Sequence, residues 1–294
     1  MPYSTLRKFT CGTLLACLPT LSFAQWFSDA GIEVLVNDNL SRSARDGAED
    51  TGVSARASGG YHWQTGDYTG ISVLGSIQKN VWESWSGMNS LKAGLGIQLR
   101  HKFGIGETMP VLNLQLGVDQ QHYNIAVRDA DVYTAGLSVS KRFTPALQLS
   151  LGASHERSDG DHEQGLPAFG MWPAKSGKVW DYSAWTLSLQ GELDLNEASW
   201  LNAALQYRDG DVVSTGITYA GNVASLASTY DPAFGLHAVA YRLDARTQIY
   251  TLDYNRALWR SSTWYAGAEY QTSRTSSGID YKAGILRTGF IHAF

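Results

Sequence analysis

Cysteine is almost absent from this chain of 294 residues, and both examples, Cys11 and Cys17, lie near its start. Charge is also scarce, since 17% of the residues are charged, and neither sign dominates. The 23 Lys and Arg residues stand against 27 Asp and Glu residues, which gives a formal net charge of -4. This balance provides no basic surface of the kind that binds nucleic acid, so we exclude nucleic acid as a partner.

Long apolar runs are missing after the first two dozen residues, and the mean hydropathy is -0.21. A spanning helix needs about 20 consecutive apolar residues, so a bundle of membrane helices is excluded. A membrane-spanning strand is apolar only at every second position, and the lack of long runs does not exclude it. The chain contains 30 Gly, 15 Tyr and 10 Trp, which favours many half-buried strands over a helical core.

The start of the chain has the pattern of an export signal. Arg7 and Lys8 form a short basic region, a mostly apolar stretch follows, and small residues lead up to Ala24. We predict a signal peptide at residues 1–24, cleaved after Ala24, and a single domain at residues 25–294.

A second interpretation of the start stays open, because Leu14-Leu15-Ala16-Cys17 resembles a lipoprotein box that would leave Cys17 acylated. Leu15 fits that box poorly, and we prefer cleavage after Ala24. The mature chain then has no cysteine, which excludes disulfides, thiol chemistry and cysteine-based metal sites.

An alternation with a period of two dominates the rest of the chain. In one segment, residues 53–63, the odd positions carry Val, Ala, Gly, Tyr and Trp, and the even positions carry Ser, Arg, Gly and His. This period predicts strands with one apolar and one polar face. Because no helices are available to cover the apolar faces, we expect them to contact lipid and the sheet to close on itself. Twelve segments follow the pattern: Ile32–Val36, Val53–Trp63, Ile71–Ile77, Leu91–Phe103, Leu112–Val118, Tyr133–Phe143, Leu147–His155, Trp185–Leu195, Leu201–Tyr207, Tyr250–Tyr254, Trp264–Tyr270 and Leu286–Phe294.

The connections between these segments alternate in length, as they do in barrels with short turns at one end and longer loops at the other. The short ones lie at residues 64–67, 104–110, 144–146, 196–199 and 257–261. The longer ones lie at residues 38–51, 80–89, 124–131, 157–181, 209–246 and 272–279.

One region breaks the alternation. Apolar residues occupy odd positions at Val239, Tyr241 and Leu243 but even positions at Tyr250 and Leu252. Either a bulge or a hairpin outside the membrane would explain the change, and a count of ten or fourteen strands stays open.

Aromatic residues gather beside the predicted short turns and at the end of the chain, at Tyr61, Trp63, Tyr68, Phe103, Phe143, Trp200, Trp259, Trp264 and Phe294. With the export signal, the alternating strands and the terminal Phe294, the chain resembles the outer-membrane β-barrels of Gram-negative bacteria. The resemblance implies an all-β, antiparallel, up-and-down transmembrane barrel of about 12 strands in the cell outer membrane, with both termini periplasmic. It also implies that the barrel-assembly machinery reads Phe294 as a sorting signal, and that outer-membrane lipid and lipopolysaccharide surround the barrel.

Charged residues on the polar faces are the candidates for a functional lumen. The parity of the strands assigns ten of them to the interior: Arg56, Lys92, Arg100, Asp119, Arg142, Glu192, Asp194, Arg208, Asp253 and Glu269. Rings of charge can set the ion selectivity of a pore. The same residues could instead pair across the barrel and plug it, and both interpretations stay open.

Catalytic and metal chemistry find little support. His155 and Ser158 faintly resemble the His and Ser of an outer-membrane phospholipase, but residues three apart on a strand point to opposite faces. Two acidic loop stretches, Asp159-Gly-Asp161-His162-Glu163 and Asp38 with Asp46, Glu49 and Asp50, lack the spacing of a calcium loop. We therefore assign no catalytic residue, no metal and no cofactor.

The architecture favours a small porin-like channel, for diffusion or for a specific solute. An alternative is a barrel that anchors loops which bind a partner in secretion, polysaccharide export or surface assembly; an enzyme acting on lipids is the least favoured. Specificity for a solute or partner is expected in the loops at residues 157–181 and 209–246, which are rich in aromatic and apolar residues: Leu166, Phe169, Met171, Trp172, Trp180, Tyr219, Tyr230 and Phe234.

Overall fold

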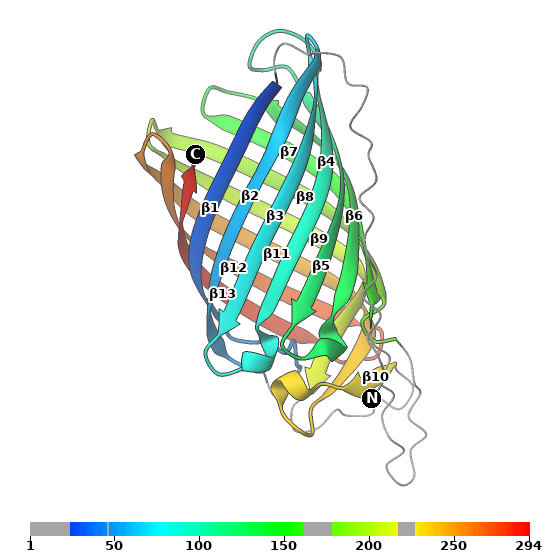
Figure 1. The fold of residues 1–294 in the computed structure, drawn as a ribbon. Coiled ribbons are helices and arrows are strands. Elements are labelled where there is room, and N and C mark those ends of the chain that lie inside the picture. Colours follow the sequence, from blue (N-terminus) through cyan, green and yellow to red (C-terminus); the bar gives the residue numbers. More distant parts are fainter. Residues whose placement is uncertain (1–23, 46, 162–177, 217–226) are drawn as a thin grey trace, which may run out of the picture.

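The computed structural model describes residues 24–45, 47–161, 178–216 and 227–294. Within these residues, twelve long strands form one antiparallel sheet that closes on itself because β13 pairs with β1 (Figure 1). Each of the twelve predicted segments coincides with one of these strands, and only Phe103, Phe143 and Phe294 lie one residue past a strand end. The strands are β1 (Ala24–Asn37), β2 (Asp50–Gly66), β3 (Thr69–Trp82), β4 (Ser90–Lys102), β5 (Val111–Tyr123), β6 (Ala130–Arg142), β7 (Leu147–Gly160), β8 (Tyr182–Asn196), β9 (Ser199–Gly216), β11 (Val239–Trp259), β12 (Ser262–Thr275) and β13 (Tyr281–Ala293).

Four short elements among the described residues lie outside the barrel wall. They are the strand β10 (Ser228–Tyr230), which pairs with the start of β11, and three short helical turns, η1 (Ser86–Met88), η2 (Ala126–Arg128) and η3 (Pro232–Phe234). In the described part of the chain, none of the helical elements has the length and the apolar character needed to cross a membrane.

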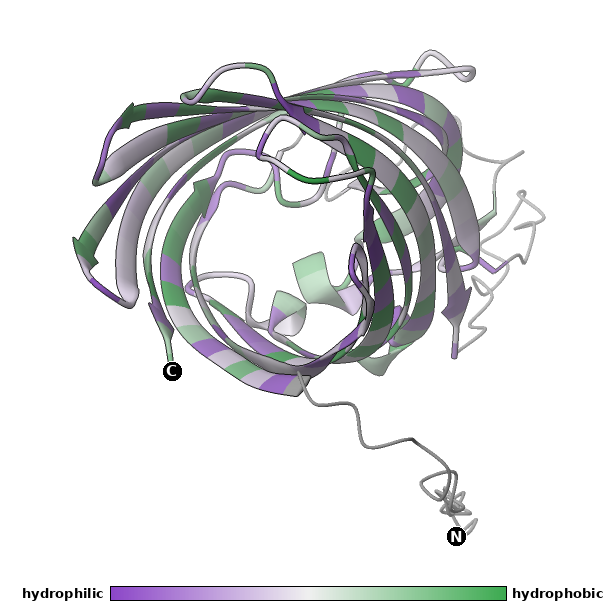
Figure 2. Ribbon diagram, turned by 90° about the horizontal axis from the view of Figure 1, so that it is seen from above, coloured by the Kyte–Doolittle hydropathy of each residue, from purple (hydrophilic) through white to green (hydrophobic). Residues whose placement is uncertain are grey.

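The two ends of the barrel differ, as the lengths of the connections predict. The short connections and the end of β13 lie at one end, which we call the turn end, and the long connections with β10 and the helical turns lie at the other, which we call the loop end (Figure 1). Seen along the barrel axis, polar and apolar residues alternate along the strands (Figure 2).

The outer wall carries the apolar face. Leu95, Leu151 and Leu187 are 66%, 65% and 58% exposed, which would be unfavourable in water for side chains repeated on every strand. Two groups of exposed aromatic residues flank this apolar belt. Tyr68, Phe103, Phe143, Trp259 and Phe294 lie near the turn end, whereas Tyr133, Trp185, Tyr207, Tyr250 and Tyr270 lie toward the loop end. The second group was not predicted, and it is typical of the opposite interface of a membrane.

Trp200 corrects one part of the predicted aromatic group. It pairs in register with Asp194 on one side and with Asn255 on the other, and Asp194 points inward to an arginine. Side chains directly opposite in register share a face of the sheet, so Trp200 lies on the inner wall. The prediction failed because Trp200 precedes the first apolar residue of its strand, where parity is hard to assign from sequence.

The break in the alternation comes from a change of surroundings and not from a bulge. Residues 239–256 of β11 pair with β9 without any shift in register. Tyr241, Leu243 and Ala245 point inward and are almost fully buried, whereas Tyr250 and Leu252 point outward and are exposed. The hairpin of β9 and β11 therefore continues past the apolar belt, where its interior is packed and its outer face is polar.

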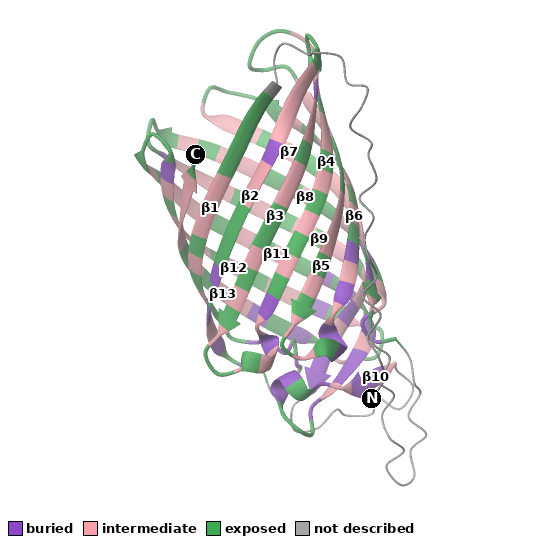
Figure 3. Cartoon of the chain, in the orientation of Figure 1, coloured by how far each residue is buried: buried purple, intermediate pink, exposed green. Residues whose placement is uncertain are grey.

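The extension of β9 and β11 past the belt makes the longest loop shorter than predicted and fixes the number of strands. Residues 209–216 and 239–246, predicted as parts of a loop, are the ends of β9 and β11. Their inner side chains Val212, Tyr241, Leu243 and Ala245 form a small core in the mouth of the barrel together with Tyr281 of β13. Most of the buried residues of the barrel lie at this loop end (Figure 3). Neither ten nor fourteen strands is correct.

Exchange of Leu252 for arginine tests the position of the apolar belt. Leu252 is 54% exposed on the outer wall, so Leu252→Arg should lower the free energy of unfolding from phospholipid vesicles by about 2–4 kcal/mol. Gln248→Arg, four residues closer to the loop end on the same face, should cost only about 0–1 kcal/mol. Denaturant unfolding of both variants measures the difference, and equal losses would show that the belt does not end between these positions.

Candidate functional site: the charged lumen and its cap

The inner wall of the barrel carries the ten charged residues predicted for the lumen. Strand alternation places each of them on the face opposite to the exposed apolar side chains. Eight of them make ion pairs: Arg56, Lys92, Asp119, Arg142, Glu192, Asp194, Arg208 and Asp253. Glu269 accepts a hydrogen bond from Gln271, and Arg100 makes no ion pair with a described residue.

The ion pairs connect strands that are neighbours or next neighbours in the wall. Lys92 on β4 lies 3.2 Å from Asp119 on the adjacent β5. Arg142 on β6 reaches over β7 to Asp194 on β8, at 3.0 Å, and to Glu192, at 3.7 Å. Arg208 on β9 reaches over β8 to Glu156 on β7, at 3.5 Å. The charges of the strands are therefore paired along the wall, and no ion pair between described strand residues bridges opposite sides of the lumen.

The pair of Arg287 and Asp253 shows how such contacts pass over a strand. Arg287 on β13 donates from Nε and Nη2 to the two carboxylate oxygens of Asp253 on β11, at 3.0 and 2.9 Å. Gly267 on β12 lies in register between them. A Cβ on Gly267 would lie 1.8 Å from Asp253 Oδ1, so only glycine leaves room for the pair.

A second contact repeats this arrangement one strand further along the wall. Tyr265 on β12 donates its hydroxyl to Glu33 on β1, at 2.8 Å. Gly289 on β13 lies in register between them, and a Cβ there would lie 2.6 Å from the Tyr265 ring. Glycines on the inner wall thus allow polar side chains from the flanking strands to meet.

The paired charges remain accessible to water. The side chains of Arg56, Glu156, Glu192 and Asp194 are 54%, 40%, 39% and 39% exposed, although they point inward. A cavity of about 420 Å³ lies against the inner wall, lined among others by Gln190, Glu192, Asp253, Glu269 and Arg287. The described part of the lumen is therefore polar and solvated, in contrast to a packed core.

At the loop end, segments from several connections form a cap over the mouth of the barrel. The turn η3 packs against η1 and the first loop, which comprises residues 38–49, through a cluster of Ala48, Met88, Phe234 and their neighbours. The rings of Trp85 and Phe234 lie 5.3 Å apart. Helical turns of the cap are visible within the outline of the barrel in Figure 2.

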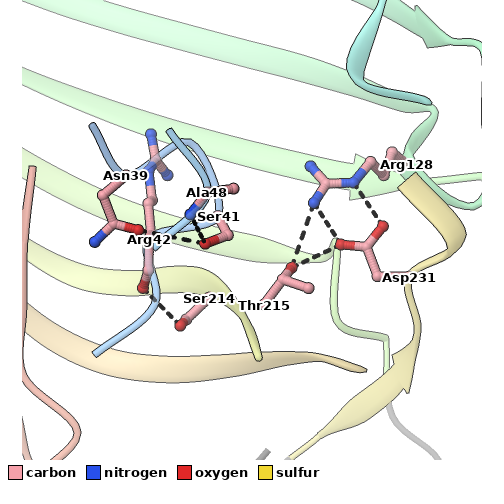
Figure 4. Close-up of polar contacts among 8 residues, drawn as sticks. All are labelled: Asn39, Ser41, Arg42, Ala48, Arg128, Ser214, Thr215 and Asp231. Carbon is pink, nitrogen blue, oxygen red and sulfur yellow. Dashed lines mark hydrogen bonds and ion pairs between the residues drawn. The ribbon is translucent and has the colours of Figure 1, made fainter. Parts of the chain in front are cut away.

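A buried ion pair fastens this cap to the wall. Arg128 of η2 donates from Nε to Asp231 Oδ1, at 2.9 Å, and from Nη2 to Asp231 Oδ2, at 2.5 Å (Figure 4). Thr215 at the end of β9 donates its hydroxyl to the same carboxylate, at 2.6 Å. Asp231 is fully buried and Arg128 is 8% exposed, so the carboxylate depends on these donors.

Aromatic residues surround the same arginine. The Arg128 guanidinium lies 4.6 Å from the centroid of the Trp180 ring and 5.2 Å from that of Phe234. Both rings belong to the loops in which specificity was predicted, and both fold inward. Leu166, Phe169, Met171, Trp172 and Tyr219 of those loops lie outside the described residues.

The first loop adds a further cation. Ser214 donates its hydroxyl to the backbone carbonyl of Arg42, at 2.7 Å, and the Thr215 N–H donates to Ser41, at 2.9 Å (Figure 4). Arg42 is exposed to the solvent of the mouth, where desolvation by the surrounding wall opposes its charge, but the phenols of Tyr281, Tyr182 and Tyr123 and the carboxylate of Glu156 raise the pKa of its guanidinium above the usual value. Arg42 is therefore a cation at every physiological pH.

Arg287, Arg128, Asp231 and Arg42 were not among the predicted residues. Arg287 lies in the closing strand, where the prediction used the apolar positions and did not consider the polar residues between them. Arg128 and Asp231 are separated by 103 residues, and no local pattern indicates that they meet.

The weak catalytic candidates lie apart, as strand parity indicates. His155 stacks on the exposed Trp185 of the outer wall, with ring centroids 4.6 Å apart, whereas Ser158 is 2% exposed on the inner wall. Among the described residues no group of three or more His, Cys, Asp or Glu side chains is placed to hold a metal. Asp46, His162 and Glu163 of the two acidic stretches lie outside those residues.

The comparisons with known proteins agree with this architecture. No family model and no curated protein matches the sequence. An outer membrane channel from Pseudomonas putida F1 is similar in structure, with a TM-score of 0.56 over 92% of this chain and 95% of that chain at 10% sequence identity. The outer membrane channel DcaP of Acinetobacter baumannii has a TM-score of 0.43 over 92% of this chain and 97% of that chain, at 8% identity. At this TM-score the similarity does not support an assignment of fold or function.

The first of these similarities, together with strand closure and the apolar outer wall, defines the class of fold. The chain is an all-β, antiparallel transmembrane barrel of the outer-membrane type, built from 12 strands. At 10% identity the similarity shows the fold alone, and the solute or partner must be argued from the residues.

Replacement of Gly267 tests whether the wall needs glycine for its ion pairs. In Gly267→Ala the new methyl group must displace Asp253 from Arg287, and we expect a loss of about 1–3 kcal/mol in the free energy of unfolding. Gly75→Ala is the matched control, because its nearest atom would be 3.7 Å away. Denaturant unfolding in detergent measures both variants, and equal stability of the two would contradict the role assigned to Gly267.

Proposed function

We propose that the protein is a small porin-like channel for polar solutes. The observation that carries the proposal is the pairing of inward charges along the wall, as in Arg287 with Asp253 and Arg142 with Asp194, which leaves the middle of the lumen free of cross-barrel pairs. Because both signs line the lumen and neutralise each other locally, the channel should select weakly between cations and anions.

The cap is the constriction of this channel. Its segments are held in the mouth by Asp231, which accepts from Arg128 and from Thr215. Loss of one partner of a buried ion pair leaves an uncompensated charge, which costs about 3–5 kcal/mol. Weakening this contact should therefore widen the mouth without changing the wall.

The alternative role as an anchor for partner-binding loops gains no support from the described loop residues. Trp180 and Phe234, which were candidates for contact with a partner, are buried within the cap. A surface for a secretion or polysaccharide partner would need such side chains to be displayed outward.

Conductance in planar lipid bilayers tests the channel and its constriction together. The purified protein should give discrete current steps, and Asp231→Asn should raise the mean conductance because Arg128 loses its counter-charge. Glu49→Gln, which changes an exposed acid of the first loop, should leave the conductance unchanged. Absence of current steps from both the unchanged protein and Asp231→Asn would contradict the proposal.

The same proposal includes the location and route of the protein. We propose that residues 1–24 are removed after Ala24, that Phe294 directs insertion by the barrel-assembly machinery, and that the turn end faces the periplasm. Arg246 and Arg274, paired in register on the outer wall of the loop end, would then lie among lipopolysaccharide phosphates.

Membrane fractionation with protein sequencing of the mature N-terminus tests the location and route. We expect outer-membrane material that begins at Gln25, and loss of Phe294 should reduce its amount. A mature chain that begins at an acylated Cys17, or one recovered in the inner membrane, would contradict this route.

A further inference from the structure

A cavity of about 440 Å³ lies in the mouth of the barrel, on the lumen side of the cap. Its lining comes from the first loop, from η1 and η2, from Trp180 in the loop before β8 and from residues of nine strands, including Arg42, Tyr123, Ser158, Tyr182 and Tyr281. The volume falls within the range of pockets that bind small molecules, which is about 300–1,000 Å³. A solute that passes between the mouth and the lumen would meet this cavity.

Arg42 is held in the cavity by an unusual backbone conformation. Its φ is +53°, and it is the one non-glycine residue with a positive φ in the described part of the chain. The hydroxyl of Ser214 and the N–H of Thr215 hold the carbonyls of Arg42 and Ser41, and the Arg42 N–H donates to Asn39 at 3.0 Å. Such strain persists where the surroundings impose it, and it is typical of binding sites.

Of the three arginines that line the cavity, Arg42 is the one that forms no ion pair with a described carboxylate. Arg128 pairs with Asp231 and Arg208 pairs with Glu156, whereas Arg42 makes no ion pair within 4.0 Å of a described carboxylate. Figure 4 shows the Arg42 carbonyl accepting a hydrogen bond from Ser214, while the Arg42 guanidinium makes none to the residues drawn. A carboxylate that enters the cavity could therefore pair with Arg42 without breaking an ion pair between described residues.

Two buried polar atoms in the same lining also have no partner. Ser158 Oγ and Trp180 Nε1 make no hydrogen bond to any described residue, although their residues are 2% and 8% exposed. Among the described residues the one other such atom is Asp29 Oδ1. Buried polar groups are nearly always paired, and the concentration of two exceptions in one cavity indicates a bound molecule that supplies hydroxyl or carboxylate oxygens.

The remaining lining limits the body of that molecule. Tyr123, Tyr182 and Tyr281 contribute aromatic rings, which pack against flat apolar faces and offer hydroxyl groups. Glu156 and Asp211 contribute negative charge, which opposes the entry of a second anionic group. The set fits a ring or chain with several hydroxyl groups and one carboxylate.

We infer that this cavity is a binding site for a small hydroxylated monocarboxylate, of the chemical class of the sugar acids. The carboxylate pairs with Arg42, and hydroxyl oxygens accept from Trp180 and exchange hydrogen bonds with Ser158. The inference rests on the proposed channel for its biological meaning, since it makes the cavity a selective step at the mouth.

Glucuronate and glucose distinguish a carboxylate site from a site for any sugar. Added to single channels in planar bilayers, glucuronate should interrupt the current at lower concentration than glucose. Arg42→Gln should raise the half-blocking concentration of glucuronate by at least about tenfold, because a charge-assisted contact is lost. Arg42→Lys should restore part of the block, and Arg246→Gln, a cation of the outer wall at the same end, should not change it.

Calorimetric titration of the detergent-solubilised protein with glucuronate separates this inference from the channel itself. Binding that disappears in Arg42→Gln and weakens in Ser158→Ala, in a protein without current steps, would keep the site and overturn the channel. Current steps with equal block by glucose and glucuronate, or with block unchanged in Arg42→Gln, would overturn the site and keep the channel.

Discussion

Closure of the sheet between β1 and β13 is the constraint on which the rest of the structure depends. Nine residue pairs, from Asp29 with Ala293 to Asn37 with Ile285, join the two ends of the chain. A strand edge left open in hydrocarbon would expose backbone groups that lipid cannot satisfy, so the barrel is stable in a membrane only when closed. Closure then divides every strand into a face toward lipid and a face toward the lumen. The polar side chains of the lumen face need hydrogen-bond and ion-pair partners inside the barrel, and most of the charged ones find them on neighbouring strands of the wall.

The same division reverses at the loop end. Within the belt, apolar residues such as Leu252 point outward, but past it Leu243 and Tyr241 on the same strand point inward. Lipid no longer covers the outer wall there, so the hydrophobic effect favours burial inside the mouth. This reversal supplies the small core in the mouth of the barrel, next to the cap and the first loop.

Sequence alone predicts the barrel well because lipid imposes a period of two on each strand. The twelve segments, the alternating connections and the change of phase near Val239 were all readable from residues close together in the chain. The cap was not predictable, because Arg128 approaches Asp231 and Thr215 from 103 and 87 residues away. The Arg287 pair was missed for a related reason: the significance of Gly267 appears only when the register of three strands is known. The odd or even position of a residue predicts which face of the sheet its side chain lies on, whereas its partner on a neighbouring strand depends on the register of the strands.

Access of a charged, membrane-impermeant thiol reagent to single cysteines shows whether the lumen is filled with water and lined by wall-bound charges. Strand β8 offers neighbouring positions on both faces, with Ser188 and Gln190 on the inner wall and Leu187 and Leu189 on the outer wall. The natural cysteines lie in the first 17 residues and leave the barrel free of background. In lipid vesicles, cysteines at 188 and 190 should react and those at 187 and 189 should be protected. Protection at all four positions would contradict a solvated lumen.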